Sequence, residues 1–312
     1  MSTTLLVASA GGHLAELHRL RQRLPGAAEI AWITTEHSHS RSLLAHENAL
    51  FLPHSPSRSV RAALRNLRLT RATLKSLRPT RVVSNGASIA VPILAQAAWR
   101  GIPAHYIESA ARVVGPSMTG KLLQHVPGVR TYTQWPGWAS RRWRFAGSVM
   151  DGWEACTEAR SAPIRRVVVT VGTESWPFRA LFEHVRRCLP AGVDVLWQCG
   201  CTPVQDLGLT GVASLPAHEL ERAIGEADLV IAHSGVGSAL AAIDKGKAPV
   251  LLPRRTARGE AVDDHQAQIG RELALRNLAV FCEVEELTPN HLERAAATAV
   301  RRRAQVPPLD LA

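Results

Sequence analysis

The chain has 312 residues, of which 46% are hydrophobic and 20% charged, proportions typical of a soluble globular protein. This length favours two domains over one, and no apolar stretch approaches the roughly 20 residues of a membrane span. The first residues, MSTTLLVASAGG, lack a basic segment and run straight into a strand, so no signal peptide is expected.

Charge and cysteines narrow the choice of partners and compartment. Residues 1–150 hold 19 Lys and Arg against 5 Asp and Glu, a net charge of +14, whereas the rest of the chain carries −3. A polybasic surface suits nucleic acid, anionic lipid headgroups or a diphosphate-bearing acceptor. The five cysteines are scattered, which fits a reducing cytoplasm. Cys199-Gly-Cys201 could be half a metal site, but there is no second cysteine pair, so no metal is expected.

The first half of the chain alternates strand-like and helix-like segments. Strands are predicted over 3–9, 29–35, 49–53, 81–86, 104–109, 130–135 and 141–147. Helices are predicted over 14–24, 59–79 and 89–101, the second of them ended by Pro79. This alternation predicts a parallel, doubly wound α/β sheet.

The second half repeats the pattern after a stretch without clear period, 147–163. Strands are predicted over 165–173, 193–200, 228–235, 248–255 and 278–283, and helices over 178–189, 218–227, 262–277 and 291–304. We therefore expect two Rossmann-like domains, residues 1–148 and 165–312, joined by a linker at 149–164. A ligand cleft between them is expected at the carboxyl ends of the strands.

A glycine turn follows the first predicted strand, in VASAGGHLAEL. A helix N-terminus offers unpaired N–H groups and the positive end of a dipole, so it attracts phosphate or a developing anion. A pair of glycines such as Gly11 and Gly12 is common in such turns and is a weak signal by itself. The histidine that follows them, His13, makes a functional site more specific. A neutral imidazole there could accept a proton from an attacking hydroxyl, or it could cap the turn structurally.

Two further glycine turns follow strands of the second half. VTVGTES places Gly172 and Thr173 between a strand and a helix, where they could hold a phosphate or only cap the helix. HSGVGS is close to the dinucleotide fingerprint G-x-G-x-x-G without matching it, and no P-loop is present, so a dehydrogenase would lack its motif. The turn still sets four small residues at a helix start, as diphosphate binding requires: Ser234, Gly235, Gly237 and Ser238.

The string DDHQ at 263–266 lies at the start of a predicted helix. His265 and Gln266 would project from its first turn into the cleft, where a glutamine can both donate to and accept from sugar hydroxyls. Plain helix capping is the alternative interpretation.

The predicted helix over 59–79 is basic along one stripe. Its basic residues recur every three or four positions, and no Asp or Glu occurs between Glu47 and Glu108. A solvated outer face is the ordinary interpretation, but a face without acids favours contact with an anionic membrane. The residues expected to make this contact are Arg61, Arg65, Arg68 and Arg71.

Taken together, the motifs resemble a known family over nearly the whole chain. VASAGGH, the segment from RVVSNG to GKLLQ and QW at 134–135 resemble the acceptor-side subunit of the two-part GlcNAc transferase that extends dolichol-linked sugars, and its bacterial exopolysaccharide homologues. VTVGTESWPF, AHSGVGSALAAIDKGKAPVLLPRR and GEAVDDHQAQIGREL resemble the donor-side subunit, a glycosyltransferase 28 C-terminal domain. The peptidoglycan lipid-linked GlcNAc transferase is a more distant relative. The chain resembles both subunits fused.

The resemblance implies the GT-B plan and a UDP-sugar held mainly by the second domain. It places Gly172, Thr173, Ser234, Gly235, Gly237 and Ser238 around the diphosphate, and His265 and Gln266 where the sugar is read. His13 matches the acceptor-domain histidine near the reaction centre, with Gly11 and Gly12 beside it. Glu108, a second catalytic candidate, and Ser109 lie in a segment that faces the cleft.

One position departs from the family pattern. The family usually carries a glutamate on the helix after the second-half glycine turn, where it holds the ribose hydroxyls, and this chain has Ala241 there. Asp244, three residues on, could substitute. The eukaryotic acceptor subunit also has a membrane-spanning anchor, for which the basic helix is the natural substitute here.

The sequence thus favours an inverting, metal-independent glycosyltransferase that moves a sugar from a UDP-sugar to a lipid-linked saccharide in bacterial cell-surface polysaccharide synthesis. We expect no cofactor and no nucleic acid partner, and a cytoplasmic location on the inner face of the cell membrane. A nucleotide-sugar epimerase and a non-catalytic subunit of a polysaccharide assembly complex are the alternatives. The donor sugar and the acceptor leave no readable pattern.

Overall fold

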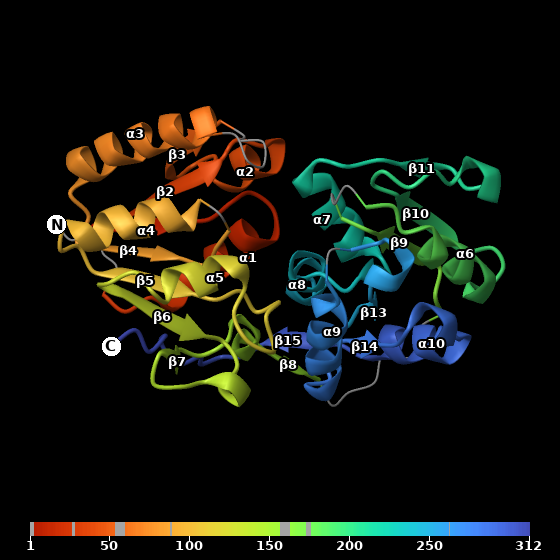
Figure 1. Cartoon of the computed structure of the whole chain (residues 1–312). Coiled ribbons are helices and arrows are strands. Elements are labelled where there is room, and N and C mark those ends of the chain that lie inside the picture. Colours follow the sequence, from red (N-terminus) through yellow and green to blue (C-terminus); the bar gives the residue numbers. More distant parts are fainter. Residues whose placement is uncertain are drawn as a thin grey trace. The chain divides into compact units, whose positions relative to one another are not determined.

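Two compact units make up the structure, a computed structural model that describes residues 3–26, 29–53, 60–87, 89–156, 163–172, 176–261 and 263–312 (Figure 1). Unit 1 comprises Met1–Val149 and Val306–Ala312, and unit 2 comprises Met150–Gln305. The side chains of residues 38, 39 and 60–67 lie outside the description.

Unit 1 is built on a parallel seven-stranded sheet in the order β3-β2-β1-β4-β5-β6-β7. Its strands are apolar runs that two layers of helices bury, as parallel sheets require. The chain moves outward from β1 to β3 and then returns to place β4 beside β1, so the carboxyl ends of β1 and β4 flank the switch point where such sheets bind ligands. The strands are β1 (Thr3–Val7), β2 (Glu29–Thr35), β3 (Asn48–Leu52), β4 (Arg81–Ser84), β5 (Ala104–Ile107), β6 (Val129–Thr133) and β7 (Trp143–Phe145).

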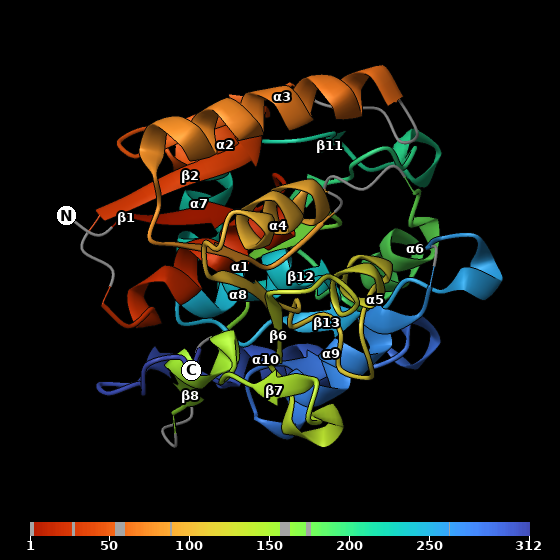
Figure 2. The same ribbon diagram turned by 60° about the vertical axis from the view of Figure 1, so that its left-hand side comes forward.

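The helices of unit 1 are α1 (Gly12–Leu20), α2 (Ser38–Leu43), α3 (Val60–Leu77), α4 (Ala90–Trp99) and α5 (Met118–Leu123). Short 3-10 turns follow at η1 (Arg21–Arg23) and η2 (Pro136–Trp138). Helix α4 packs against both α3 and α5, so these three helices cover one face of the sheet (Figure 2). The basic helix α3 contributes Leu74 to the core of this unit, where its side chain is buried.

Unit 2 repeats the plan with a parallel six-stranded sheet in the order β11-β10-β9-β12-β13-β14. Its switch point lies between β9 and β12, so the turns that follow these two strands are neighbours. The strands are β9 (Arg166–Thr170), β10 (Asp194–Gln198), β11 (Gly211–Val212), β12 (Leu229–His233), β13 (Val250–Leu252) and β14 (Val280–Phe281). The helices are α6 (Arg179–Cys188), α7 (Ala217–Glu226), α8 (Val236–Asp244), α9 (His265–Leu275) and α10 (Pro289–Ala297), with 3-10 turns η4 (Gln205–Leu207), η5 (Thr256–Arg258) and η6 (Val284–Glu286).

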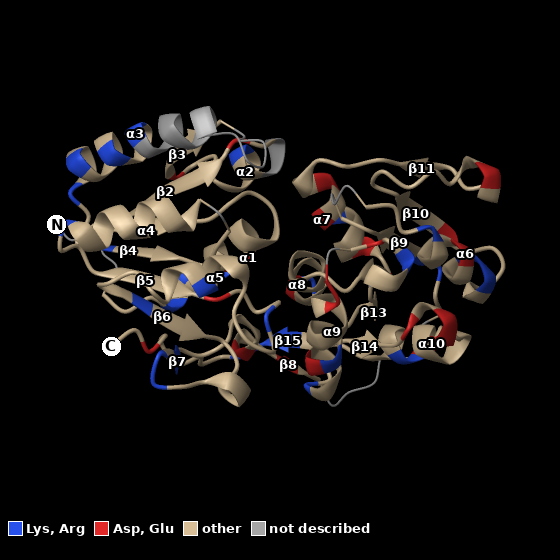
Figure 3. Cartoon of the chain, in the orientation of Figure 1, with Lys and Arg blue, Asp and Glu red and all other residues tan. Residues whose placement is uncertain are grey.

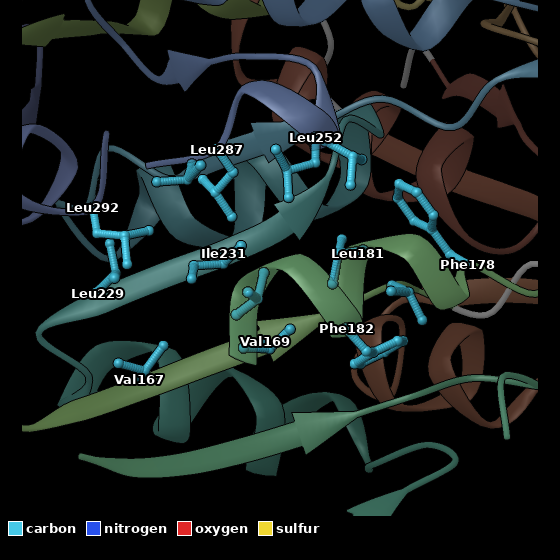
Figure 4. Close-up of a cluster of buried hydrophobic side chains, with 14 of the residues drawn as sticks. Val167, Val169, Phe178, Leu181, Phe182, Leu229, Ile231, Leu252, Leu287 and Leu292 are labelled. Atoms are coloured by element: carbon cyan, nitrogen blue, oxygen red, sulfur yellow. The ribbon is translucent and has the colours of Figure 1, made fainter. Parts of the chain in front are cut away.

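The core of unit 2 explains why its strands read as nearly continuous apolar runs. Side chains from β9 and β12 meet those of α6 on one face of the sheet, as Figure 4 shows for Val169, Ile231 and Phe182. Phe182 is completely buried. Burying a side chain of this size contributes roughly 1.5–3 kcal/mol relative to leaving it in water.

The sequence prediction was wrong at the end of the chain. The last helix, predicted over 291–304, ends at Ala297, and β15 (Val300–Arg302) pairs antiparallel with β8 (Trp153–Ala155), which follows the 3-10 turn η3 (Val149–Gly152). Thr298 ends the helix in an extended conformation, and Val300 is buried in the small sheet. A local helical pattern therefore gives way to a strand pairing across more than 140 positions of sequence.

The last seven residues belong to unit 1, although the sequence analysis assigns them to the second domain. Leu309 and Leu311 are buried there. The N–H of Leu309 donates to the Arg23 carbonyl at 2.8 Å, and Tyr132 Oη donates to the Leu311 carbonyl at 3.0 Å. The tail thus completes the core of a unit whose other residues all precede position 150.

Candidate functional site

The turn between β12 and α8 sets the predicted diphosphate residues at one helix N-terminus. Gly235 is the N-cap of α8, and its N–H donates to the His233 carbonyl at 2.8 Å. Gly237 and Ser238 lie in the first turn of the helix, and Ser238 Oγ is 3.3 Å from His233 Nδ1. Ser234 is fully buried, and its Oγ has no hydrogen-bond partner within the described residues. This turn can therefore bind a phosphate through its backbone N–H groups and the helix dipole, and less through Ser234 Oγ.

A buried histidine supports this turn. A Cβ on Gly235 would lie 2.4 Å from His233 Nε2, and one on Gly172 would lie 2.7 Å from His233 Cε1. Burial, and after it the positive charge of Arg254, lower the pKa of His233 to about 3, so the ring is neutral at physiological pH. One neutral ring thus fills the space beneath both glycine turns. The sequence signal was a histidine at the end of an otherwise apolar strand, but no role was predicted for it.

The loop after β9 is the first predicted donor loop. Gly172 has φ +69°, a left-handed conformation that favours glycine, and its carbonyl accepts from Gln198 Nε2 at 3.0 Å. Thr173 lies outside the described residues. Arg254, which is 1% exposed, donates to the carbonyls of Val171 and Trp176 on the two sides of this loop. Arg254, like His233, was not predicted to have a role at this site.

The first turn of α9 holds the two residues predicted to read the sugar. Gln266 is buried rather than projecting freely, and its Oε1 accepts from the N–H of Arg254 at 3.1 Å. His265 is partly exposed, and its Nδ1 pairs with Asp263 Oδ1. The structure thus ties Gln266 to the residue that braces the Gly172 loop, and only His265 retains substantial exposure.

Ala241, where the resemblance expects a glutamate, packs against a small apolar cluster formed with α7. Asp244 is the last residue of α8 and pairs with Arg302 at 2.9 Å. Because a helix rises about 1.5 Å per residue, Asp244 lies about 12 Å along the axis from the first residue of α8. Asp244 lies three residues, almost one helical turn, beyond Ala241 and pairs with Arg302, and its substitution for the missing glutamate stays a prediction.

In unit 1, His13 is held by the turn after β4. Its Nδ1 lies 2.9 Å from the Asn85 carbonyl, and Asn85 Nδ2 donates to the His13 carbonyl at 2.8 Å. A Cβ on Gly86 would lie 2.8 Å from His13 Cε1, so the ring rests on a glycine. A carbonyl oxygen can only accept, so Nδ1 carries the proton and Nε2 is the nitrogen that can take one up. Gly11, at φ +89°, is the N-cap of α1, and Gly12 is exposed beside it.

Glu108 lies directly after β5 and is 1% exposed. Its carboxylate accepts from Ser117 N at 2.9 Å, Ser117 Oγ at 3.0 Å, Tyr106 Oη at 3.0 Å and Ser109 N at 3.2 Å. Burial raises the pKa of Glu108, and the hydrogen bonds from Ser117, Tyr106 and Ser109 oppose that rise. The side chain predicted to be catalytic therefore holds the segment 109–117 in place, and its catalytic role stays a prediction.

Ser109 belongs to a second buried network, centred on Glu16 of α1. Ser109 Oγ donates to Glu16 Oε2 at 2.8 Å, Ala110 N donates to Glu16 Oε1 at 2.9 Å, and Gln134 Nε2 also donates to Oε1. Gln134 Oε1 in turn accepts from the Val149 N–H at 2.7 Å. This network fixes the helix that begins beside His13 to the ends of β5 and β6. Glu16 was not predicted, because a lone glutamate in a helix is usually solvent-exposed.

Burial raises the pKa of Glu16 from 4.5 to about 7, which predicts a pH-dependent stability. The folded state binds this proton more tightly, so the stability it contributes is complete below pH 4.5 and is lost as the pH rises to 7. Glu16→Gln has no carboxyl to titrate, so the variant lacks this pH dependence. Between pH 5 and 8, the unfolding free energy of the variant should therefore gain about 3 kcal/mol relative to wild type.

Urea unfolding of both proteins across this pH range measures the difference. Glu36→Gln, at an exposed carboxylate paired with Arg41, is the matched control for the loss of a carboxylate charge. Parallel pH curves for wild type and Glu16→Gln would contradict the assignment of a raised pKa to Glu16.

The basic stripe of α3 is described in part. Arg68 and Arg71 are exposed, whereas the side chains of Arg61 and Arg65 lie outside the described residues. Figure 3 shows basic residues along the described part of α3. No described helix is long and apolar enough to cross a membrane. No cluster of three or more His, Cys, Asp or Glu suited to a metal ion occurs in the described part of the chain.

Comparisons with known proteins relate this chain to glycosyltransferases. Residues 166–306 match the glycosyltransferase family 28 C-terminal domain. The UDP-N-acetylglucosamine transferase subunit ALG14 of Rattus norvegicus is 30% identical, over 42% of this chain and 74% of that protein.

Solved structures confirm the predicted GT-B fold class of two Rossmann-like domains. MurG of Acinetobacter baumannii has a TM-score of 0.59 at 17% identity, covering 95% of this chain and 94% of its own. The glycosyltransferase SnogD of Streptomyces nogalater has a TM-score of 0.57 at 16% identity, with 95% and 90% covered. A putative UDP-N-acetylglucosamine 2-epimerase of Listeria monocytogenes has a TM-score of 0.56 at 13% identity, with 94% and 91% covered. Transferases and an epimerase share the fold, so the fold does not separate the two activities.

Proposed function

We propose an activity for this chain, which belongs to the family of UDP-N-acetylglucosamine transferase subunit ALG14 and carries a glycosyltransferase family 28 C-terminal domain. The proposed activity is the transfer of a sugar from a UDP-sugar to a hydroxyl of a lipid-linked saccharide. The chain is a glycosyltransferase, and the donor, the acceptor class and the inverting course are the proposed parts. The observation that carries the donor assignment is the pair of glycine turns after β9 and β12, both resting on the neutral ring of His233.

The donor turns suit a leaving diphosphate. In the proposed step the acceptor oxygen bonds to the anomeric carbon, the bond from that carbon to the diphosphate oxygen breaks, and UDP leaves with the electron pair. The N-terminal N–H groups of α8 would stabilise this charge, because preorganised donors are most effective where charge develops. No step needs a metal ion. A single displacement at the anomeric carbon inverts its configuration.

His13 is the proposed general base. Its Nδ1 is committed to the Asn85 carbonyl, which presents Nε2 as the proton acceptor in a fixed ring orientation. The proton of the acceptor hydroxyl would pass to Nε2 as the new bond forms. Gly11 and Gly12 leave the approach to α1 without side chains.

A basic surface of unit 1 that also exposes apolar side chains supports the proposal of a lipid-linked acceptor. Between Glu47 and Asp151 the only acidic residue is Glu108, which is buried. The α3–α4–α5 side of the unit also exposes large apolar side chains: Trp99 is 80% exposed, Met118 71% and Leu122 57%. Exposed apolar side chains among cations suit the interface of an anionic bilayer. We therefore propose peripheral binding to the inner face of the cell membrane.

The basic stripe can be tested by removing two charges. Arg68→Gln with Arg71→Gln should weaken binding to anionic vesicles by about 2 kcal/mol at low salt, since each basic residue near the surface contributes roughly 1 kcal/mol. Sedimentation with phosphatidylglycerol vesicles measures the effect, and UDP affinity should not change. Arg187→Gln with Arg222→Gln, two exposed positions of unit 2, is the charge-matched control. Equal vesicle binding by both double variants would refute the assignment to α3.

The transfer itself is tested by incubating the protein with a panel of UDP-sugars and membrane lipid extracts containing lipid-linked saccharides. Release of UDP that requires both substrates, with a glycolipid product of increased mass, is the expected result. Conversion of a UDP-sugar without any acceptor would instead indicate an epimerase. Failure to bind UDP would indicate a non-catalytic subunit.

A further inference from the structure

Arg254 is a buried cation at the carboxyl end of β13. Its side chain is 1% exposed, and Cζ lies 4.9 Å from the centre of the Phe178 ring. Placing a guanidinium out of water costs several kcal/mol unless hydrogen bonds and charges compensate. A residue of this type inside a core is therefore expected to have a specific task.

The guanidinium bridges the two sides of the first donor loop. Nη2 donates to the Val171 carbonyl at 3.0 Å, and Nη1 donates to the Trp176 carbonyl. Between these two carbonyls the chain runs through Gly172 to Ser175. The planar fork of an arginine can hold two carbonyls in a fixed relation, which the single ammonium of a lysine cannot do as rigidly.

The backbone of the same residue holds a third segment. The N–H of Arg254 donates to Gln266 Oε1 at 3.1 Å, in the first turn of α9. Arg254 therefore joins the loop after β9, the end of β13 and the start of α9. Each of the other two segments carries a residue predicted to bind the donor, Gly172 or Gln266.

The charge of Arg254 reaches the neighbouring turn. It contributes, after burial, to the low pKa of His233, and the ring of His233 occupies the space that a Cβ on either Gly172 or Gly235 would need. Arginine stays protonated throughout the accessible pH range. The electrostatic potential at the two glycine turns therefore has a permanent positive contribution from Arg254, which water screens little because the guanidinium is buried.

We infer that Arg254 has two functions in the donor site of unit 2: it holds the carbonyls of Val171 and Trp176 in place, and with them the adjoining Gly172, and it supplies a fixed positive charge that favours a nucleoside diphosphate over the uncharged nucleoside. The inference rests on the proposed UDP-sugar donor. Arg254 is a positioning residue here, since its contacts are with the protein and its charge acts through the turns.

Two variants separate position from charge. Arg254→Gln keeps an N–H donor and loses the charge, and Arg254→Lys keeps the charge and loses the fork. Arg222→Gln, on the exposed face of α7, removes the same charge from the surface of the same unit and is the control. Calorimetric titration of each protein with UDP and with uridine gives the ratio of the two affinities, and thermal unfolding establishes that each variant is folded.

Arg254→Gln should weaken UDP binding by about 10- to 100-fold and lower the UDP-to-uridine affinity ratio by about tenfold, as expected for removing one charge several ångströms from a diphosphate at an effective dielectric constant of about 20. Arg254→Lys should keep that ratio within about threefold of wild type. It should speed hydrogen exchange at Gly172, because the loop loses one anchor. Arg222→Gln should leave both affinities unchanged.

Equal losses for UDP and uridine in Arg254→Gln would overturn the charge function, and unchanged exchange at Gly172 in Arg254→Lys would overturn the positioning function. If Arg254→Gln does not fold, a ratio in Arg254→Lys that falls as far as tenfold would overturn the charge function by itself. Absence of UDP binding by the wild type would refute the proposed donor and the charge function with it. Wild-type binding that the Arg254 variants leave intact would refute the inference alone.

Discussion

Replacing His13 with alanine is expected to lower turnover by about 100- to 10,000-fold, the usual contribution of a general base. The ring is held by Asn85 and rests on Gly86, so removing it takes away the proton acceptor from a preformed position. UDP affinity should be unchanged, because the proposed donor residues all belong to unit 2. Steady-state transfer to a lipid-linked acceptor and calorimetric titration with UDP measure the two effects.

A histidine of the same helix provides the control for His13→Ala. The ring of His18 stacks on Trp32 with centroids 6.0 Å apart, so His18→Ala changes packing and leaves the proposed chemistry intact. We expect His18→Ala to retain turnover within a few-fold of wild type. A loss below about threefold in His13→Ala would assign that residue to capping the turn rather than to proton transfer.

Substituting Gly235 should abolish UDP binding. Even the Cβ of alanine would lie 2.4 Å from His233 Nε2, and valine adds two further methyl groups. The ring beneath is buried and has little room to move, so we expect the turn to shift and the N–H groups of α8 to lose their alignment. The new side chain at position 235 would therefore clash with His233 inside the protein, and not only with the incoming diphosphate. We expect a loss of at least about 100-fold in UDP affinity for Gly235→Val, comparable to losing the oriented donors of an anion site.

Two variants show whether the effect arises at His233. Gly225→Ala, in α7, brings its Cβ no closer than 3.8 Å to Lys245 and should bind UDP normally. Gly235→Ala combined with His233→Ala relieves the conflict and should recover part of the affinity that Gly235→Ala loses, a coupling that a double-mutant cycle quantifies. Folded Gly235→Val with wild-type UDP affinity would show that the diphosphate binds elsewhere.

Most of the fold could be predicted from the sequence because its strands are short, apolar and separated by helices of regular period. The segment EIAWITT became a strand with the predicted ends, and RVVVT forms the central part of the strand predicted over 165–173. Four of the short elements were not predicted, because each has at most six residues, too few for a period to show: α2, α5, β8 and β11. The strand β15 was taken for helix because its pairing with β8 is set by a distant segment, not by local propensity.

The sequence by itself determined the two Rossmann-like units, the glycine turns at their helix starts and the concentration of positive charge in the first half. These follow from local rules: alternating apolar periods, the conformational freedom of glycine and a count of charges. Only the tertiary structure decided which polar side chains support those turns. His233, Arg254 and Glu16 are far in sequence from most of what they contact, and burial changes their chemistry, making His233 neutral and raising the pKa of Glu16 to about 7. Burial and long-range hydrogen bonds depend on the packed chain, and no local pattern records them.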